Sequence, residues 1–410
     1  MSDWINGTVG DLIQLSRGID LPEQQRKLGA VPIMGSFGVT GYHNRAACSG
    51  PGVTVGRSGG SIGVVSYTTE DYWPLNTALY VKDFKGNDPR FCYYFLQTLD
   101  LARLNSGSAQ PSLNRNFVHP VETRFPDRDN QIKIAALLGA LDDKIELNRR
   151  VNETLEAMAR AIFKDWFVDF GPTRAKIEGR APYLTPDIWA LFPDRLDADG
   201  EPGDWTHATI DDACAAIYSG GTPATGHANY WNGGIPWLSS GETRHPVVTE
   251  TERSITELGV QDSSTRLARL GSTVIASAGQ GGTRGQASFL AIDTYINQSV
   301  IAATANPNVV SSTFLFFDLS SRYEELRRLS DGNSSRGSLT TKIVGGLTVT
   351  LPSQDLVQAF HEIAEPVLRR MAGNLRENRT LATIRDLLLP KLMSGEIRIR
   401  HAEAIAADAA

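Results

Sequence analysis

The chain has 410 residues, of which 41% are hydrophobic and 21% charged, values typical of a globular protein with two or three domains. No run of about 18 apolar residues is present, which excludes a membrane-spanning helix, and the start of the chain shows no secretion signal. The net charge of −6 excludes a protein that attracts nucleic acid over its whole surface, so DNA binding would need local contacts or a partner that contacts the phosphates.

Residues 1–125 predict a first compact block of mixed structure. Short strands are indicated by apolar runs between glycine-rich turns, at Val31–Met34, Val53–Val55, Gly63–Tyr67 and Thr77–Val81. Apolar residues at helical spacing predict a helix over Pro89–Leu104, and a polar loop over 105–116 leads to a last strand near Val118–Thr123. This mixture of short strands and few helices predicts an α+β fold.

Residues 126–170 predict a long amphipathic helix. Apolar side chains recur there every three or four residues along one stripe that two asparagines interrupt, namely Ile134, Leu137, Leu141, Ile145, Asn148, Asn152, Leu155, Met158 and Ile162. At ~1.5 Å per residue, a helix of about 35–40 residues is a rod of roughly 55 Å.

The same stripe occurs a second time in residues 352–400. Adding 226 to each number keeps every apolar position apolar and both asparagines in place, giving Phe360, Ile363, Val367, Met371, Asn374, Asn378, Leu381, Ile384 and Leu388. Asparagines in an apolar seam fix the register and partner of paired helices. The repeat therefore predicts that the two helices pair, although two independent amphipathic helices would show similar stripes.

Residues 204–351 repeat the plan of the first block loosely. Ile235-Pro236-Trp237-Leu238 corresponds to Val31-Pro32-Ile33-Met34, and Ser338-Leu339-Thr340 corresponds to Ser112-Leu113-Asn114. Elsewhere the lengths and residues differ. Two blocks with one plan and different loops predict two readers of different targets.

The remaining segments connect or end these parts. Residues 171–203 contain several prolines and glycines, which predicts a linker with one short helical turn at Pro186–Leu191. The alanine-rich tail at 401–410 is expected to fray.

The sequence contains one pattern that is near a catalytic motif. Pro126-Asp127 followed by Asp142-Asp143-Lys144 is similar to the acidic-lysine pattern of metal-dependent nucleases. Such a site needs its side chains to converge on a metal, whereas Asp142 and Lys144 belong to one long helix, so we interpret them as part of a solvated helix face. Three scattered cysteines without a CxxC pair indicate no zinc site or disulfide framework and fit the reducing cytoplasm.

Candidate DNA-contact residues lie in polar loops of both blocks. Arginine suits guanine, and asparagine or glutamine suits adenine. The candidates of the first block are Arg57, Ser58, Ser61, Gln110, Asn114, Arg115 and Asn116, and those of the second block are Gln280, Thr283, Arg284, Gln286, Asn333, Arg336 and Lys342. Corresponding loops in two related blocks favour a shared role, while solvent-facing turns with ordinary polar residues are the alternative.

The chain resembles the specificity subunit of type I restriction-modification systems. The resemblance rests on the alternation of variable block and long helix, and on helical motifs at Ile132–Leu155, Phe163–Phe170, Arg174–Gly179 and Leu389–Ile397. It implies target recognition domains at 1–125 and 204–351, a central spacer helix at 126–170, a linker at 171–203, a C-terminal spacer helix at 352–400 and a tail at 401–410.

The resemblance further implies a non-catalytic DNA-binding subunit in the cytoplasm. Each recognition domain would read one half of a bipartite double-stranded DNA target, and the two helices would pair antiparallel as a coiled coil that sets the spacer between the halves. The helices would dock two methyltransferase subunits, and two restriction subunits could join. S-adenosylmethionine, ATP and Mg²⁺ would then belong to the partners, with no cofactor or metal on this chain.

Two other readings remain open from the sequence alone. A coiled-coil scaffold whose flanking domains bind proteins would show no salt-dependent affinity for DNA. A stand-alone enzyme with an unfamiliar site would bind a metal or S-adenosylmethionine by itself.

Overall fold

The computed structural model describes residues 4–104, 112–279, 282–333 and 337–408. The chain forms two compact units. Unit 1 comprises Met1–Leu147 and Glu377–Ala410, and unit 2 comprises Asn148–Arg376. Each unit therefore contains half of each long helix. The domain boundaries inferred from the sequence stay predictions.

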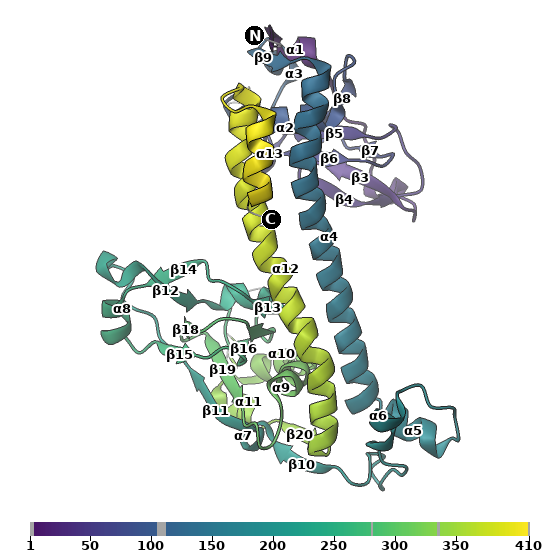
Figure 1. The fold of residues 1–410 in the computed structure, drawn as a ribbon, viewed down its shortest axis with the longest axis vertical. Coiled ribbons are helices and arrows are strands. Elements are labelled where there is room, and N and C mark those ends of the chain that lie inside the picture. Colours follow the sequence, from purple (N-terminus) through teal and green to yellow (C-terminus); the bar gives the residue numbers. More distant parts are fainter. Residues whose placement is uncertain (1–3, 105–111, 280–281, 334–336, 409–410) are drawn as a thin grey trace. The chain divides into compact units, whose positions relative to one another are not determined.

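The two long helices are α4 (Arg128–Phe167) and α12 (Gln354–Ser394) (Figure 1). Both end before the predicted positions, at points where the backbone becomes left-handed. Phe170 has a φ of 56° beyond α4, and Gly395 follows α12 directly with a φ of 74°. Glycine after the last helical residue is a common helix stop, because it adopts this conformation without a steric cost.

The tail that was expected to fray contains the helix α13 (Ile399–Asp408). Its apolar face packs on unit 1, where Ala402 is fully buried and Ala406 contacts the core. Tertiary packing, which the alanine-rich composition did not reveal, therefore orders this segment.

In unit 1, a frame and two sheets precede the long helix. The frame strands β1 (Trp4–Thr8) and β9 (Glu122–Pro126) pair antiparallel. One sheet has the order β2-β8-β5-β6 and the other the order β4-β3-β7. Their strands are β2 (Gln14–Arg17), β3 (Val31–Gly35), β4 (Gly38–His43), β5 (Gly52–Gly56), β6 (Val65–Thr68), β7 (Trp73–Pro74) and β8 (Ala78–Asp83).

Short helices complete unit 1, and two of them depart from the predicted elements. The helix predicted over Pro89–Leu104 stops early, as α2 (Pro89–Gln97), and a separate 3₁₀ turn, η3 (Leu101–Leu104), follows. The strand predicted near Val118–Thr123 begins only at Glu122, because Val118 belongs to α3 (Arg115–Val118). The remaining short elements are α1 (Val9–Leu12), η1 (Glu23–Gln25) and η2 (Gly59–Ser61).

Unit 2 has the same plan with additional edge strands. Its frame strands β10 (Thr206–Thr209) and β20 (Thr348–Leu351) pair antiparallel. The sheets have the orders β11-β19-β16-β17-β13 and β14-β12-β18-β15. Their strands are β11 (Cys214–Ser219), β12 (Trp231–Leu238), β13 (Val247–Val248), β14 (Arg253–Ile255), β15 (Arg266–Ala268), β16 (Thr273–Ala276), β17 (Ala287–Leu290), β18 (Thr294–Ile296) and β19 (Val300–Ala305).

The helices of unit 2 include the short turn predicted in the linker. That turn is α6 (Pro186–Ala190), and a second helix, α5 (Gly171–Ile177), precedes it. The others are α7 (Ile210–Ala213), η4 (Ala228–Tyr230), η5 (Ser240–Arg244), α8 (Glu257–Gln261), α9 (Ser312–Ser321), α10 (Tyr323–Asn333) and α11 (Thr341–Gly345).

Strand pairing confirms that the two blocks are copies of one design. In each unit a short parallel pair joins neighbouring strands, with Met34 opposite Pro74 in unit 1 and Leu238 opposite Ile296 in unit 2. A threonine capping box begins the helix that follows the first frame strand in each unit, through Thr8 at α1 and Thr209 at α7. The prediction of an α+β protein with two pseudo-symmetric blocks, each followed by a long helix, is thus confirmed.

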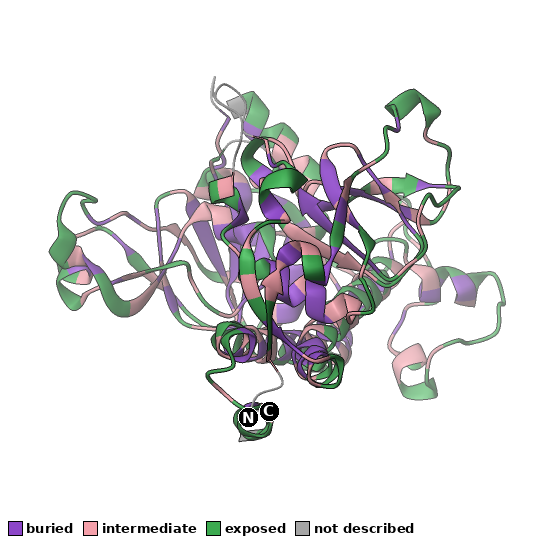
Figure 2. Cartoon of the chain, turned by 90° about the horizontal axis from the view of Figure 1, so that it is seen from above, coloured by how far each residue is buried: buried purple, intermediate pink, exposed green. Residues whose placement is uncertain are grey.

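Each unit buries the inner face of the long helices in its own core. In unit 1, Leu138 and Leu388 are fully buried beside Phe91 and Leu113. In unit 2, an aromatic cluster around Phe163 continues the helix face, and its rings pack edge-on against Phe314 and Phe360. Buried residues accordingly lie on one side of the helices seen end-on in Figure 2, with exposed residues on the other.

The helix seam is antiparallel within each unit. In unit 1, Leu137, Leu141 and Ile145 of α4 share a core with Leu381 of α12, from the far end of that helix. In unit 2, Leu155 shares a core with Ile363, Val367 and Met371. Met158 is the exception among the predicted stripe positions, because it is 54% exposed while Ala159 is buried. The buried face turns there toward the aromatic cluster.

Asparagines contact each other inside the seam of unit 2. Asn374 donates a hydrogen bond from Nδ2 to Asn152 Oδ1 at 2.8 Å, and Asn152 donates from Nδ2 to the Met371 carbonyl at 3.2 Å. Asn148, Asn152 and Asn374 are buried, and Asn378 is half-buried. Because a shifted register would leave these amides unpaired in an apolar seam, the geometry supports a role in fixing register.

Candidate nucleic-acid interface

The structure brings the two predicted DNA-contact loops of unit 1 together. The Leu113 amide donates to the Arg57 carbonyl at 2.8 Å, and Ser58 forms a strand-like bridge with Ser112. The loop after β5 therefore lies beside the segment that leads into α3. Two stretches that are far apart in sequence form one surface region.

Some side chains in this region of unit 1 hydrogen-bond within the protein, and others are exposed to solvent. Ser61 is buried and donates to the Ser58 carbonyl at 3.0 Å. Asn114 caps α3 by accepting from the Asn116 amide at 3.0 Å, while Arg115 and Asn116 are exposed. Gln110 lies outside the described residues.

Arg57 is half-buried at the end of β5. Its Nη1 donates to the Asn76 carbonyl at 3.4 Å. Burial, and then the neighbouring positive charge of Arg17, lower the pKa of Arg57. Arg17 stands at the end of β2 and was not among the sequence candidates, because a lone arginine outside the polar loops gives no signal of its neighbours in the fold.

Unit 2 joins its two predicted loops in the same way. The Leu339 amide donates to the Ser277 carbonyl at 2.8 Å, which reproduces the contact of Leu113. Because Leu113 and Leu339 are both buried and make equivalent hydrogen bonds, the alignment of Ser338-Leu339-Thr340 with Ser112-Leu113-Asn114 is confirmed.

Arg284 has a structural environment that its sequence context did not predict. It is 8% exposed, pairs with Asp331 and directs Nη1 to the Gly337 carbonyl at 3.4 Å. Thr283 and Gln286 are half-buried, and Lys342 is exposed on α11. Gln280 and Arg336 lie outside the described residues, as does the side chain of Asn333. The DNA-contact set as a whole stays a prediction.

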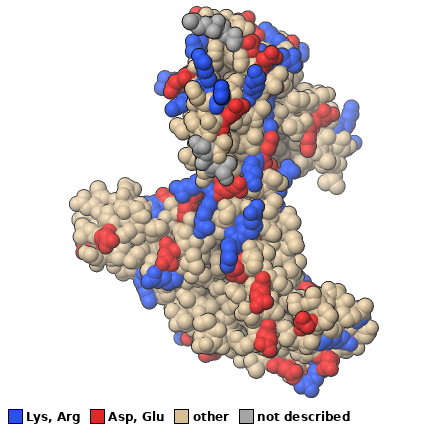
Figure 3. Space-filling model, in the orientation of Figure 1, with Lys and Arg blue, Asp and Glu red and all other residues tan. Residues whose placement is uncertain are grey.

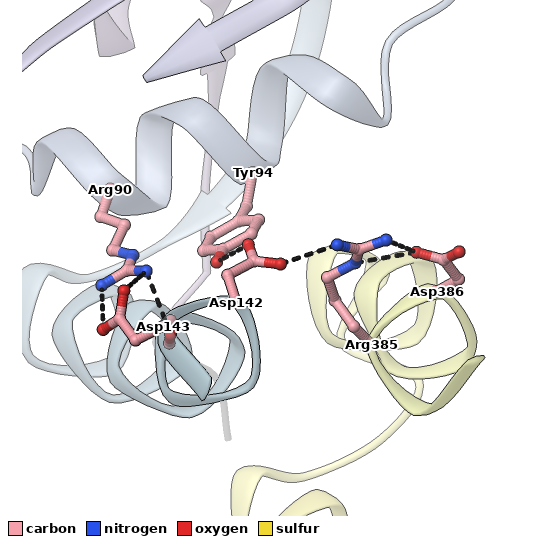
Figure 4. A network of polar contacts seen from close by, with 7 residues as sticks. Arg90, Tyr94, Asp142, Asp143, Arg385 and Asp386 are labelled. Carbon is pink, nitrogen blue, oxygen red and sulfur yellow. Dashed lines mark hydrogen bonds and ion pairs between the residues drawn. The ribbon is translucent and has the colours of Figure 1, made fainter. Parts of the chain in front are cut away.

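A polar network connects α2 of unit 1 to both long helices (Figure 4). Arg90 donates to both oxygens of Asp143 at 2.6 and 2.9 Å and to the Gly139 carbonyl at 3.0 Å. Tyr94 donates its hydroxyl to Asp142 at 2.5 Å, and Arg385 of α12 donates to the other Asp142 oxygen at 2.7 Å. Within unit 1, Asp142 thus accepts from the recognition block and from α12.

Charge and burial in this network shift the pKa values of Asp143 and Tyr94. Hydrogen bonds from Arg90 hold the pKa of Asp143 below its usual value. Burial, and then the hydrogen bond to Asp142, raise the pKa of Tyr94. Lys144, part of the nuclease-like pattern, forms an ion pair with Glu377 at 3.3 Å. These residues thus lie on a helix face, as predicted, but that face is not fully solvated, because Asp142 is half-buried between Tyr94 and Arg385.

Basic and acidic side chains are interspersed on the face of the molecule drawn in Figure 3. Within the described ranges, no group of three or more histidine, cysteine or acidic side chains could hold a metal ion. The helices in these ranges also include none that is long and apolar enough to cross a membrane.

Comparison with known proteins identifies the family. Residues 1–157 and 202–365 match the type I restriction modification DNA specificity domain. The specificity subunit of the type I restriction enzyme HindI from Haemophilus influenzae is 27% identical over 342 residues, which cover 72% of this chain and 73% of the relative. The MjaIX specificity subunit from Methanocaldococcus jannaschii is 25% identical over 316 residues, which cover 76% and 69%.

A solved structure shares the fold. The crystal structure of the S subunit of the type I restriction-modification system from M. genitalium has a TM-score of 0.66 at 17% identity, with 95% of this chain and 96% of that chain covered. The family match, in two successive copies, extends over well more than half of the chain. The chain therefore belongs to the type I restriction-modification specificity family and is a specificity subunit with two DNA target recognition domains.

Proposed function

We propose that the chain reads a bipartite DNA sequence, with one half-site assigned to the recognition block of each unit. The observation that carries this proposal is the repeated sheet topology with different loop residues at equivalent positions. A retained scaffold with divergent polar loops is the pattern expected of two readers with different specificities, because base contacts set specificity and the scaffold positions them.

In this proposal, the paired helices set the unread gap between the half-sites. The asparagine contacts of the seam support a single register, since slippage would leave amides unpaired among apolar residues. Half-sites read from one face of DNA are separated by about one turn, roughly 34 Å, which long helices can span. The gap would then depend on helix length and register and not on base contacts.

The proposal assigns catalysis to partner subunits. Two modification subunits would carry S-adenosylmethionine and methylate the target, and two restriction subunits with ATP and Mg²⁺ could join them in the cytoplasm, where the DNA is. Docking on the helices is supported by apolar side chains at solvent-facing positions, with Ile132 45%, Leu147 55%, Met158 54% and Leu387 50% exposed. These four positions are the ones at which we expect the modification subunits to contact the helices.

The test is a genome-wide map of methylated adenines in cells that express this chain with its modification subunit, compared with cells that lack only this chain. The proposal predicts a bipartite motif with a fixed gap that disappears on deletion. Unchanged methylation with an active modification subunit would refute it. A chain carrying a Leu147→Asp substitution should assemble less modification subunit and reduce methylation at all sites equally.

A further inference from the structure

Backbone pairing identifies positions that are equivalent in the two units. In unit 1, Arg17 of β2 lies opposite Leu79 of β8. In the equivalent strand pair of unit 2, Ser219 of β11 lies opposite Ile301 of β19. Gly56 pairs with Ala78, and Ala276 pairs with Val300, so Arg57 corresponds to Ser277. An arginine pair in unit 1 is thus a serine pair in unit 2.

A second pair of equivalent positions lies in the next turn of the chain. The Ile19 amide donates to the Pro74 carbonyl at 2.7 Å, and the Gly221 amide donates to the Ile296 carbonyl at 3.1 Å. Asp20 therefore corresponds to Thr222, and Asn76 to Gln298. The side chains interact in both units, since Asn76 Nδ2 donates to Asp20 Oδ1 at 2.7 Å and Thr222 Oγ1 donates to Gln298 Oε1.

A tryptophan hydrogen bond holds the backbone beside these pairs in both units. An indole N–H donates to the carbonyl next to the pair, from Trp73 to Ile19 and from Trp237 to Gly221, each at 3.3 Å. Each unit has one equivalent parallel strand pair, β3 with β7 in unit 1 and β12 with β18 in unit 2. Trp73 lies in β7, whereas Trp237 lies in β12, the counterpart of β3. Tryptophans at different positions therefore make the same hydrogen bond in the two units. An amide held by a fixed partner loses less conformational entropy when it binds.

The unit 1 positions also carry positive charge, from Arg17 and Arg57. Arg17 is exposed and Arg57 half-buried, and among the residues that the structure describes neither forms an ion pair with a carboxylate. Their mutual repulsion contributes to the lowered pKa of Arg57. Two adjacent guanidinium groups are therefore available for acceptor atoms from outside the chain, and the O6 and N7 atoms of guanine are such acceptors.

We propose that this surface reads bases in both units, through Arg17, Arg57 and Asn76 in unit 1 and through Ser219, Thr222 and Gln298 in unit 2. Ser277 is buried, so the position that corresponds to Arg57 cannot contact a base in unit 2. The inference deepens the proposed function and rests on it. Arginine favours guanine and the amides favour adenine, so the unit 1 half-site contains guanine at a position where the unit 2 half-site does not require it.

The experiment selects sequences from random DNA duplexes with the full-length chain in complex with its modification subunit. The test variant is Arg17→Ser with Arg57→Ser, which installs the unit 2 residues in unit 1. We expect discrimination at one or two base pairs of the unit 1 half-site to fall roughly 5- to 150-fold per lost bidentate contact, with the other half-site unchanged. The matched control is Lys82→Ser with Arg128→Ser, an equal charge loss at exposed positions.

A second variant guards against a folding defect in the first. Gln298 is exposed, so Gln298→Ala should leave thermal unfolding unchanged and reduce discrimination only in the unit 2 half-site. Uniform weakening of all sequences by the arginine variant would indicate phosphate contacts and overturn the assignment of base reading, as would unchanged motifs in both variants. If the wild-type complex selects no bipartite motif, the proposed function fails as well, so the two failures are distinguishable.

Discussion

The asparagine contact inside the helix seam gives a quantitative test of how the helices fix their register. Asn152→Ala removes the acceptor of Asn374 and leaves that amide, which is 1% exposed, without the partner it now has. An unsatisfied buried polar group costs about 1–3 kcal/mol, so we expect a loss of about 2 kcal/mol and a fall in Tm of about 4–8 °C. Urea unfolding of the full chain, followed by helix circular dichroism, measures the loss.

The double variant separates a specific hydrogen bond from general packing. Asn152→Leu with Asn374→Leu replaces both amides with apolar groups, so the pair should be as stable as wild type or more stable, while each single leucine variant is destabilised. The coupling energy should exceed about 1 kcal/mol. If the single variants lose less than about 0.5 kcal/mol and the effects add, the amide contact does not hold the seam, and the register argument fails.

Three further outcomes follow from particular contacts. Asp143→Asn should lower stability near pH 7 by at most about 1 kcal/mol, because Asp143 is mostly exposed. Since Arg90 lowers the folded pKa of Asp143, this contribution is fully present above about pH 4 and is lost as the pH falls through the folded pKa. Urea unfolding should therefore show a smaller wild-type advantage at pH 3 than at pH 6, and an advantage that does not shrink would contradict the ion pair. Gly18→Ala and Gly220→Ala should each lower the free energy of unfolding by about 1–3 kcal/mol or more, as measured by thermal unfolding. An added Cβ would stand 1.9 Å from the Leu75 carbonyl oxygen at Gly18 and 1.8 Å from the Ile296 carbonyl oxygen at Gly220. Gly60→Ala and Gly226→Ala are the controls, because a Cβ there would have no atom within 4 Å, and equal losses in the controls would contradict the packing argument. Asp142→Ala should destabilise unit 1 more than Glu156→Ala destabilises unit 2, as measured by urea unfolding. Asp142 joins Tyr94 to Arg385, whereas Glu156 pairs only with Arg160 on its own helix in the contacts that the structure describes. Equal losses would show that the network adds no stability beyond that of a single surface ion pair.

The long helices and the repeat could be predicted because their signal is periodic and local. An apolar stripe that recurs with two asparagines in place determines where helices form and which face is buried. The exception at Met158 arises because an aromatic cluster at the end of α4 redirects that face, and its partners Phe314 and Phe360 are far away in the sequence. The order within the tail, likewise, depends on packing of Ala402 that composition does not encode.

The candidate interface was only partly predictable for the same reason. Sequence similarity placed corresponding loops in both blocks, and the hydrogen bonds of Leu113 and Leu339 join those loops as a contiguous region. The environments of single residues followed from long-range contacts, so Arg284, a candidate by type, is buried against Asp331. Arg17, in β2, and Asn76, in the turn before β8, were not among the candidates because they become neighbours of Arg57 only in the folded protein.

Exchange of one recognition block separates the contributions of the two units to the DNA target. Residues 1–125 would be replaced by the corresponding block of a relative with a different target, and methylated adenines would be mapped in cells that contain the modification subunit. We expect that one half of the motif changes while the other half and the gap between them stay the same. A change in both halves, or a gap that varies with the block, would contradict independent reading by two domains on a fixed helical spacer.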